Sequence, residues 1–129
     1  MKNITIWGLR VFIGLVALIL LFPGFMWSFM PEANLVLNDI EVNSALGMNM
    51  LKSAMGTGLL ATSIFMLLFL LKGEKWFLPS FIIMATFLLI RLVSLFVDGS
   101  HLMIIVGILI EILSLVAMWG LNKLQSEKY

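Results

Sequence analysis

Long apolar segments separated by short polar ones dominate the chain. Continuous apolar runs cover about residues 4–29, 46–71, 76–97 and 102–121, and the only sizeable polar connection is 30–45. Each run holds at least about 20 residues, enough for an α-helix to cross the roughly 30 Å hydrocarbon core of a bilayer. The pattern predicts an all-α integral membrane protein, a four-transmembrane-helix up-down bundle in a single domain.

The composition also indicates a membrane protein, and it excludes several classes of function. Because 62% of the residues are hydrophobic and only 12% are charged, a soluble chain could not cover its own surface with polar groups. The absence of cysteine excludes disulfide exchange, thiolate catalysis and Cys-ligated metals. The basic residues are not clustered as a nucleic-acid partner would require.

The ends of the runs carry recognisable signals. The first run begins like a signal peptide but is too long for one, so it is predicted to be an uncleaved helix that Pro23 and Gly24 kink or end. The 30–45 connection fits a small hairpin or a short interfacial helix equally well. Asn43 or Ser44 is the expected N-cap of the second long helix.

The charged residues outside the runs predict the orientation. If the helices alternate, one side of the membrane receives basic residues: Lys2, Lys72, Lys75, Lys123 and Lys128. The other side receives acidic residues and one histidine: Glu32, Asp39, Glu41, Asp98 and His101. Since basic loops stay in the cytoplasm, both termini are expected to be cytoplasmic, in a multi-pass protein of the cell's inner (plasma) membrane.

Each apolar run also contains one charged residue. They are Arg10, Lys52, Arg91 and Glu111. A charge inside a membrane helix costs about 2.5–3.5 kcal/mol on the insertion scale, so it faces inward and usually carries function. Steps of three or four residues through each charge place it on a stripe with small or hydroxyl residues, the types that let membrane helices pack closely. The four stripes are Trp7, Arg10, Gly14, Ala17, Leu21 and Gly24; Lys52, Gly56, Leu59, Ser63 and Met66; Ser80, Met84, Phe87, Arg91, Ser94 and Asp98; and Gly107, Glu111, Ser114 and Met118.

Depth estimates favour an Arg91–Glu111 pair across the hairpin that closes at Asp98. From the rise of 1.5 Å per residue, Arg91 lies about 9 Å and Glu111 about 13 Å below the outer boundary, a difference that an arginine side chain spans. Lys52 lies shallower on the same side, whereas Arg10 enters from the cytoplasmic side and competes for Glu111. All four charges are expected to meet along the bundle axis, with Asp98 as a rim carboxylate.

Three interpretations of these charges stay open. They form a structural ion-pair network, a pocket for a ligand or lipid head group, or a centre for transport or catalysis. The preferred hypothesis is a non-enzymatic protein that binds a lipid, a quinone-like molecule or a partner subunit through Arg91, Glu111 and Lys52, with Asp98 and Arg10 in support. No cofactor is expected, and a lone histidine without cysteines makes a metal site unlikely.

Two alternatives use Glu111 differently. A small proton-coupled transporter needs a carboxylate that exchanges a proton for a cation, whereas the basic neighbours of Glu111 would hold it ionised. An intramembrane lipid isomerase would pair Glu111 with His101, but about 15 Å of helix axis separates them, too far for a shared proton.

Three segments resemble a known family. They are Leu51-Lys52-Ser53-Ala54-Met55-Gly56, the stretch Arg91-Leu92-Val93-Ser94-Leu95-Phe96-Val97-Asp98-Gly99, and Glu111 within the last run. Together they resemble short bacterial four-helix membrane proteins of unknown function that are related to the DoxX-like group. The resemblance implies a four-helix bundle in the bacterial inner membrane. It also implies a place as a scaffold, or as a quinone- or lipid-binding subunit, of a membrane complex.

Overall fold

The described part of the chain is helical throughout. The computed structural model describes residues 2–38, 40–97, 99 and 102–126, and these contain no β-strand. The helices are α1 (Lys2–Phe29), α2 (Pro31–Leu37), α3 (Ala45–Leu51), the π-helical turn η1 (Lys52–Gly56), α4 (Thr57–Lys72), the 3-10 turn η2 (Glu74–Trp76), α5 (Phe77–Val97) and α6 (Leu102–Ser126).

The predicted helical fold class is confirmed. Four helical segments are long and apolar enough to cross a membrane: Lys2–Phe29, Ala45–Lys72, Glu74–Val97 and Ile104–Ser126. The second of these joins α3, η1 and α4 in one continuous segment, and the third joins η2 to α5. These segments are therefore both long enough and apolar enough to cross the core of a bilayer.

One predicted helix end is wrong. α6 does not end at residue 121 but continues to Ser126, because Leu124 packs against the core and Lys123 lies 5.4 Å from the ring centroid of Trp119, one turn earlier. α1 ends at Phe29, as the predicted range 4–29 has it, so Pro23 does not end the helix. A proline removes one backbone donor, and membrane helices tolerate it where neighbouring groups compensate.

The 30–45 connection forms a short helix and no hairpin. α2 starts with Pro31 at its first position, where the missing N–H costs nothing, and the backbone N–H of Asn38 donates to the carbonyl of Asn34 at 3.1 Å. Of the two expected N-caps, Ser44 is the one used, since its Oγ accepts from the Gly47 N–H at 3.0 Å. Asp39 lies outside the described residues.

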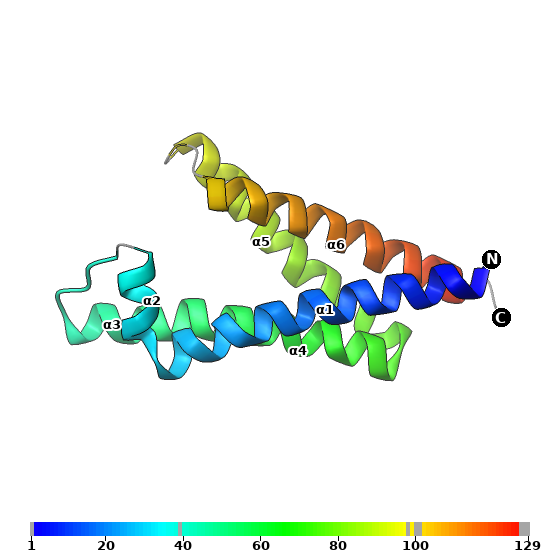
Figure 1. The fold of residues 1–129 in the computed structure, drawn as a ribbon, viewed down its shortest axis with the longest axis horizontal. Coiled ribbons are helices and arrows are strands. Elements are labelled where there is room, and N and C mark those ends of the chain that lie inside the picture. Colours follow the sequence, from blue (N-terminus) through cyan, green and yellow to red (C-terminus); the bar gives the residue numbers. More distant parts are fainter. Residues whose placement is uncertain (1, 39, 98, 100–101, 127–129) are drawn as a thin grey trace.

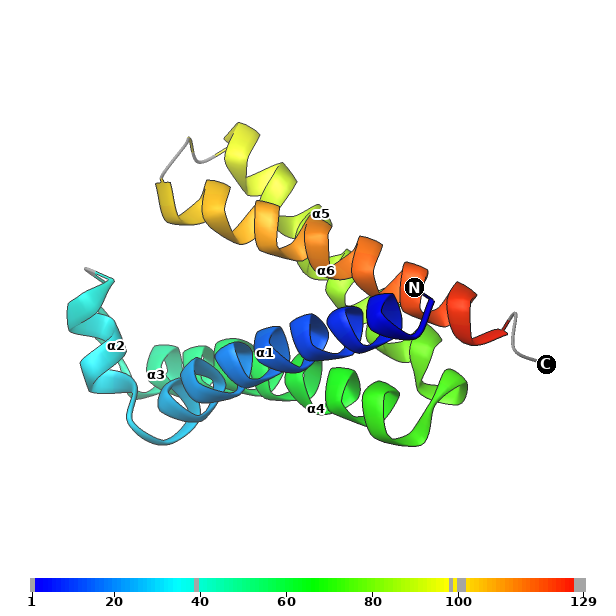
Figure 2. The same ribbon diagram turned by 45° about the vertical axis from the view of Figure 1, so that its right-hand side comes forward.

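The long helices form two pairs that diverge (Figure 1). α1 packs along α4, and α5 packs along α6. Figure 2 shows the same divergence from another side: the α5–α6 tip lies apart from the end that carries α2 and α3. The two chain ends and the α4–α5 connection lie toward the opposite end, where the pairs come together.

The core occupies the end where the pairs converge. Its fully buried members come from the middle of α1, the second half of α4, the first half of α5 and the second half of α6: Ile13, Ala17, Met66, Phe69, Met84, Met118 and Leu121. Hydroxyl groups join neighbouring helices there, because Ser63 Oγ donates to the Ala17 carbonyl at 2.7 Å and Ser80 Oγ donates to the Phe65 carbonyl at 2.7 Å. The other half of the molecule therefore consists of two separate helix pairs.

Candidate functional site: a half-used ion pair beside an apolar groove

The predicted pair between α5 and α6 is present. Arg91 Nε donates to Glu111 Oε1 at 2.6 Å, which is a short, charge-assisted hydrogen bond. It is the one ion pair that joins two described residues. The bond joins the two helices of the hairpin in the half of the molecule that lacks a shared four-helix core.

Gly107 makes room for the arginine. It lies one turn before Glu111 on α6, and a Cβ built on it would lie 2.8 Å from Arg91 Nη1 and 2.9 Å from Cζ. The guanidinium group therefore rests directly on the α6 backbone. The sequence placed Gly107 and Glu111 on one stripe of small and polar residues, and the contact explains why a small residue is needed there.

The pair leaves part of its hydrogen-bonding capacity unused. Glu111 Oε2 is buried, its side chain is only 10% exposed, and the oxygen has no hydrogen-bond partner in the part of the chain that the structure describes. Arg91 is 36% exposed, and its Nη groups make no hydrogen bond to any other described residue. A carboxylate has about four acceptor sites and a guanidinium has five donors, so one bond satisfies neither group.

Arg10 does not join this pair, contrary to the prediction. It is half-buried on α1, its Nε is buried, and it has no hydrogen-bond or ion-pair partner among the described residues. Because Glu111 Oε2 has no partner within residues 2–38, 40–97, 99 and 102–126, Arg10 does not share the carboxylate with Arg91. Arg10 belongs to the first half of α1.

Lys52 is also separate from the pair. It begins the π-helical turn η1, it is half-buried, and it makes no ion pair within the described ranges. α1 and α4, not α5 or α6, supply the main packing of η1. The expected meeting of four charges on one axis is therefore wrong, because the two helix pairs diverge. Asp98 and His101 lie outside the described residues.

The predicted stripes largely face inward. The residues buried on them are Ala17, Gly24, Gly56, Ser63, Met66, Ser80, Met84, Glu111, Ser114 and Met118. Trp7 is the exception, since it is exposed. A helix has 3.6 residues per turn, so a stripe drawn in alternating steps of three and four drifts away from the packed face over several turns.

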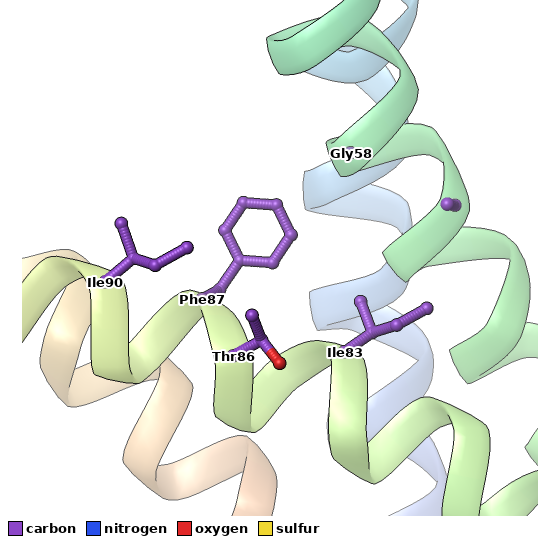
Figure 3. A pocket seen from close by; sticks show the side chains of 6 residues that line it. Gly58, Ile83, Thr86, Phe87 and Ile90 are labelled. Carbon is purple, nitrogen blue, oxygen red and sulfur yellow. The ribbon is translucent and has the colours of Figure 1, made fainter.

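An apolar groove lies between α4 and α5. It is an open groove of about 310 Å³, and its lining residues are Gly58, Ala61, Ile83, Thr86, Phe87 and Ile90; we call it the α4–α5 groove. Figure 3 shows the Phe87 ring extending from α5 toward α4 at Gly58. A Cβ on Gly58 would lie 3.0 Å from Phe87 Cζ, so the glycine admits the ring. Arg91 follows Phe87 by one helical turn.

Sequence reasoning missed this groove. The feature of the sequence that could have indicated it is Gly58 within an apolar helix. Such a glycine indicates close helix packing, but it does not show which residue fills the space beside it. The close contact to another backbone is made instead by Gly56, where a Cβ would lie 2.9 Å from the Ser28 nitrogen. The arrangement is thus an apolar groove between α4 and α5, and a polar pair between α5 and α6 with unused donors and an unused acceptor.

No protein family matches the chain, and no curated protein or solved structure matches it either. The site therefore has to be interpreted from its own geometry.

Proposed function

We propose that this chain is an integral membrane protein of the bacterial inner membrane, with four membrane-spanning helices in an up-down arrangement. Large apolar side chains are exposed along all four segments, as a lipid-facing surface requires; examples are Leu15, Ile64, Leu89 and Leu113. Lys72 and Lys75 border the α4–α5 connection, and Lys123 lies near the end of α6. These basic residues support cytoplasmic termini.

Its function, in this proposal, is to bind a lipid or a quinone-like molecule. The α4–α5 groove would hold the apolar chain, and the Arg91–Glu111 pair would meet the polar head. The observation that carries the proposal is the Arg91 side chain, which is 36% exposed and whose Nη groups have no hydrogen-bond partner among the described residues. Each unsatisfied polar group in a hydrocarbon environment costs several kcal/mol, and a polar ligand head bound to the Arg91 Nη groups would offset that cost.

The proposal also includes a family and a partner for this chain. Membership of the family related to the DoxX-like group would make the chain a lipid- or quinone-binding subunit of a membrane complex, with a partner subunit against its exposed helices. Lys52, Arg10 and Asp98 keep supporting roles in that picture, at the rims of the membrane. The bundle would act without a bound cofactor and without catalysing a reaction.

Proton-coupled transport through Glu111 is less well supported. A small exporter needs a carboxylate that releases its partner to take up a proton or a cation. Here Glu111 accepts a 2.6 Å hydrogen bond from Arg91, and the side chain is buried. Proton-driven substrate uptake in proteoliposomes that Glu111→Gln abolishes would favour the transporter over the binding protein.

The binding proposal is tested by identifying what the purified protein retains. The full chain is purified in a mild detergent, and bound lipids and quinones are measured by native mass spectrometry and lipid extraction. Replacing both charges, with Arg91→Gln and Glu111→Gln together, should reduce the retained amphiphile by about tenfold or more, since hydrogen bonds to charged groups contribute about 1.5–3 kcal/mol.

A matched control removes the same two charges elsewhere. Glu74 and Lys75 are exposed neighbours in η2, so Glu74→Gln with Lys75→Gln should leave retention unchanged. Circular dichroism establishes that both double variants keep their helix content. Equal retention by the wild type and the folded Arg91/Glu111 variant would contradict the proposed function.

A further inference from the structure

The Arg91 guanidinium is held on two sides and open on a third. Its Nε donates to Glu111 Oε1 at 2.6 Å, which fixes one edge. A Cβ built on Gly107 would lie 2.8 Å from Nη1, 2.9 Å from Cζ and 3.2 Å from Nε, so one flat face of the group lies on the α6 backbone. The remaining edge carries Nη1 and Nη2, which have no hydrogen-bond partner among the described residues, and the side chain is 36% exposed. The two Nη groups therefore form a donor edge in a fixed position, which we call the Arg91 fork.

The Arg91 fork selects its ligand by hydrogen bonding. It consists of donors alone, and the unused acceptor of the pair, Glu111 Oε2, is buried and out of a ligand's reach. A ligand therefore has to supply acceptors. Two parallel N–H groups match two oxygens of one phosphate or carboxylate, and an anionic oxygen accepts a stronger hydrogen bond than a neutral oxygen does. An oxyanion thus fits the Arg91 fork better than a hydroxyl or a carbonyl group.

The depth of the Arg91 fork in the membrane favours a lipid as the source of that oxyanion. Gly107 lies five residues after Leu102, so the guanidinium on it is about 7–8 Å from the end of α6. This depth falls in the outer quarter of a hydrocarbon core of about 30 Å. Membrane arginines lower their cost through local thinning of the bilayer, which brings lipid head groups toward them. Every phospholipid carries a phosphate in that layer.

The geometry of the Arg91 fork, more than net charge, has to supply the binding. Glu111 offsets the charge of Arg91, and the other described charge on α5 and α6, Lys123, follows Glu111 by twelve residues, or about 18 Å along the axis. The carboxylate occupies the Nε edge of the guanidinium, which leaves the Nη edge for an anion. A bidentate contact of this kind is specific to arginine, since a lysine is only a point charge.

We propose that Arg91 binds the phosphate of an anionic phospholipid, with Nη1 and Nη2 each donating to one phosphate oxygen. This inference rests on the proposed function and names its head group. The acyl chains lie in the bilayer against the exposed apolar surface of α5 and α6, so the contact requires neither Glu111 Oε2 nor the α4–α5 groove. A zwitterionic phospholipid is a weaker ligand, because its own cation competes with Arg91 for the phosphate.

Three lipids with identical oleoyl chains test the inference: dioleoyl phosphatidylglycerol, dioleoyl phosphatidylcholine and dioleoylglycerol. They carry an anionic phosphate, a phosphate with its own cation and no phosphate, respectively. The full chain, freed of bound lipid in detergent, is titrated with each and followed by native mass spectrometry. The wild type should bind phosphatidylglycerol about tenfold or more tightly than dioleoylglycerol, with phosphatidylcholine between them, because hydrogen bonds to charged groups contribute about 1.5–3 kcal/mol. Equal binding of phosphatidylglycerol and dioleoylglycerol would overturn the inference.

Arg91→Lys separates the fork from the charge. It keeps the positive charge but cannot make the bidentate contact, so it should bind phosphatidylglycerol about tenfold more weakly than the wild type does. Lys75→Gln is the control, since it removes an exposed positive charge in η2 and should keep the wild-type affinities. A folded Arg91→Lys protein with wild-type affinity would contradict the fork. The wild-type comparison of lipids stands even if Arg91→Lys does not fold.

The remaining outcomes separate a lipid from other ligands and this inference from the proposed function. Inorganic phosphate, titrated in the same way, should bind much more weakly than phosphatidylglycerol; equal binding would overturn the lipid as the source of the phosphate. A co-purified protein that excludes phosphatidylglycerol from the wild type would also overturn it. If a quinone is retained in a manner that needs Arg91 while phosphatidylglycerol is not preferred, the proposed function stands and the phosphate assignment fails. If no amphiphile depends on Arg91, both fail.

Discussion

Arg91 and Glu111 share one hydrogen bond but differ in their surroundings. The glutamate side chain is 10% exposed, whereas the arginine side chain is 36% exposed. An arginine can move its charged end along an apolar surface toward a more polar region, whereas the shorter glutamate on a packed helix face has no such freedom. The loss of one partner should therefore have unequal effects on stability.

Arg91→Ala should destabilise the protein more than Glu111→Ala. Removal of one partner from a buried pair costs about 3–5 kcal/mol, and the exposure of Arg91 places this pair below that range. Without Arg91 the buried carboxylate has no partner, whereas without Glu111 the guanidinium can reach the lipid–water boundary. The double variant should regain part of the loss of Arg91→Ala, as measured by unfolding in detergent. A double variant no more stable than the worse single variant would contradict the pairing.

Gly107 and Gly120 provide a matched pair of glycines on α6. An alanine usually stabilises a helix by about 1 kcal/mol relative to glycine. At Gly120 the new Cβ would meet only Leu9 Cδ1, at an ordinary 3.8 Å, so Gly120→Ala should raise the thermal midpoint. At Gly107 it would displace the Arg91 guanidinium, so Gly107→Ala should show no such gain and should weaken lipid retention. Equal gains in stability and unchanged retention would contradict the contact.

At the scale of elements, α1 and the η1–α4 segment approach one another most closely at glycines. A Cβ on Gly24 would lie 2.8 Å from the Leu60 nitrogen, and a Cβ on Gly56 would lie 2.9 Å from the Ser28 nitrogen. Small residues of this kind let membrane helices pack backbone to backbone. The π-helical turn η1 contains Gly56, so a local change in helix geometry coincides with one of these two close approaches.

Gly56→Ala should therefore separate the α1 and η1 backbones. Because backbone atoms cannot move aside as a flexible side chain does, we expect a loss of about 1–3 kcal/mol, in the range of overpacked cores. Gly14→Ala is the control, since its Cβ would meet Leu70 Cδ1 at 3.6 Å. The two variants are compared by thermal unfolding in the same detergent. A Gly56→Ala protein as stable as Gly14→Ala would contradict the close approach.

The periodicity of the sequence was enough to predict the elements and their inward faces. Apolar length gave the four segments, and the small and hydroxyl residues marked stripes that are mostly buried. It was not enough for the end of α6, because the residues after Leu121 alternate polar groups with Leu124, and only the tertiary contact of Leu124 with the core extends the helix. Local pattern seldom predicts such contacts.

At the scale of the whole molecule, the site depends on how the two helix pairs diverge. The pairs share a core near the chain ends and separate toward the end of α5 and the start of α6 (Figures 1 and 2). The side chains at each crossing set the angle between packed helices, and a stripe on one helix does not reveal that angle. The sequence was therefore enough to predict the Arg91–Glu111 pair, which lies within one hairpin. The prediction that Arg10 and Lys52 join this pair was wrong, because it depended on the angle between the two helix pairs.

The proposed orientation predicts which positions are open to the outside. The chain has no cysteine, so single substitutions such as Glu32→Cys in α2 and Lys75→Cys in η2 give unique labelling sites. In intact cells, a membrane-impermeant thiol reagent should label Glu32→Cys, and it should label Lys75→Cys only after permeabilisation. Basic connections remain cytoplasmic, which is the reason for the expectation. The reverse pattern would contradict the orientation.

The most direct test of the account is to locate a bound lipid on the protein. A lipid with a photoreactive diazirine in its acyl chain is added to the full chain in detergent, irradiated, and mapped by peptide mass spectrometry. The account predicts adducts concentrated on Ile83, Phe87 and Ile90, and their loss when Arg91→Gln and Glu111→Gln are combined. Adducts spread equally over exposed apolar faces such as Leu15 and Leu18 of α1, unchanged in that variant, would contradict it.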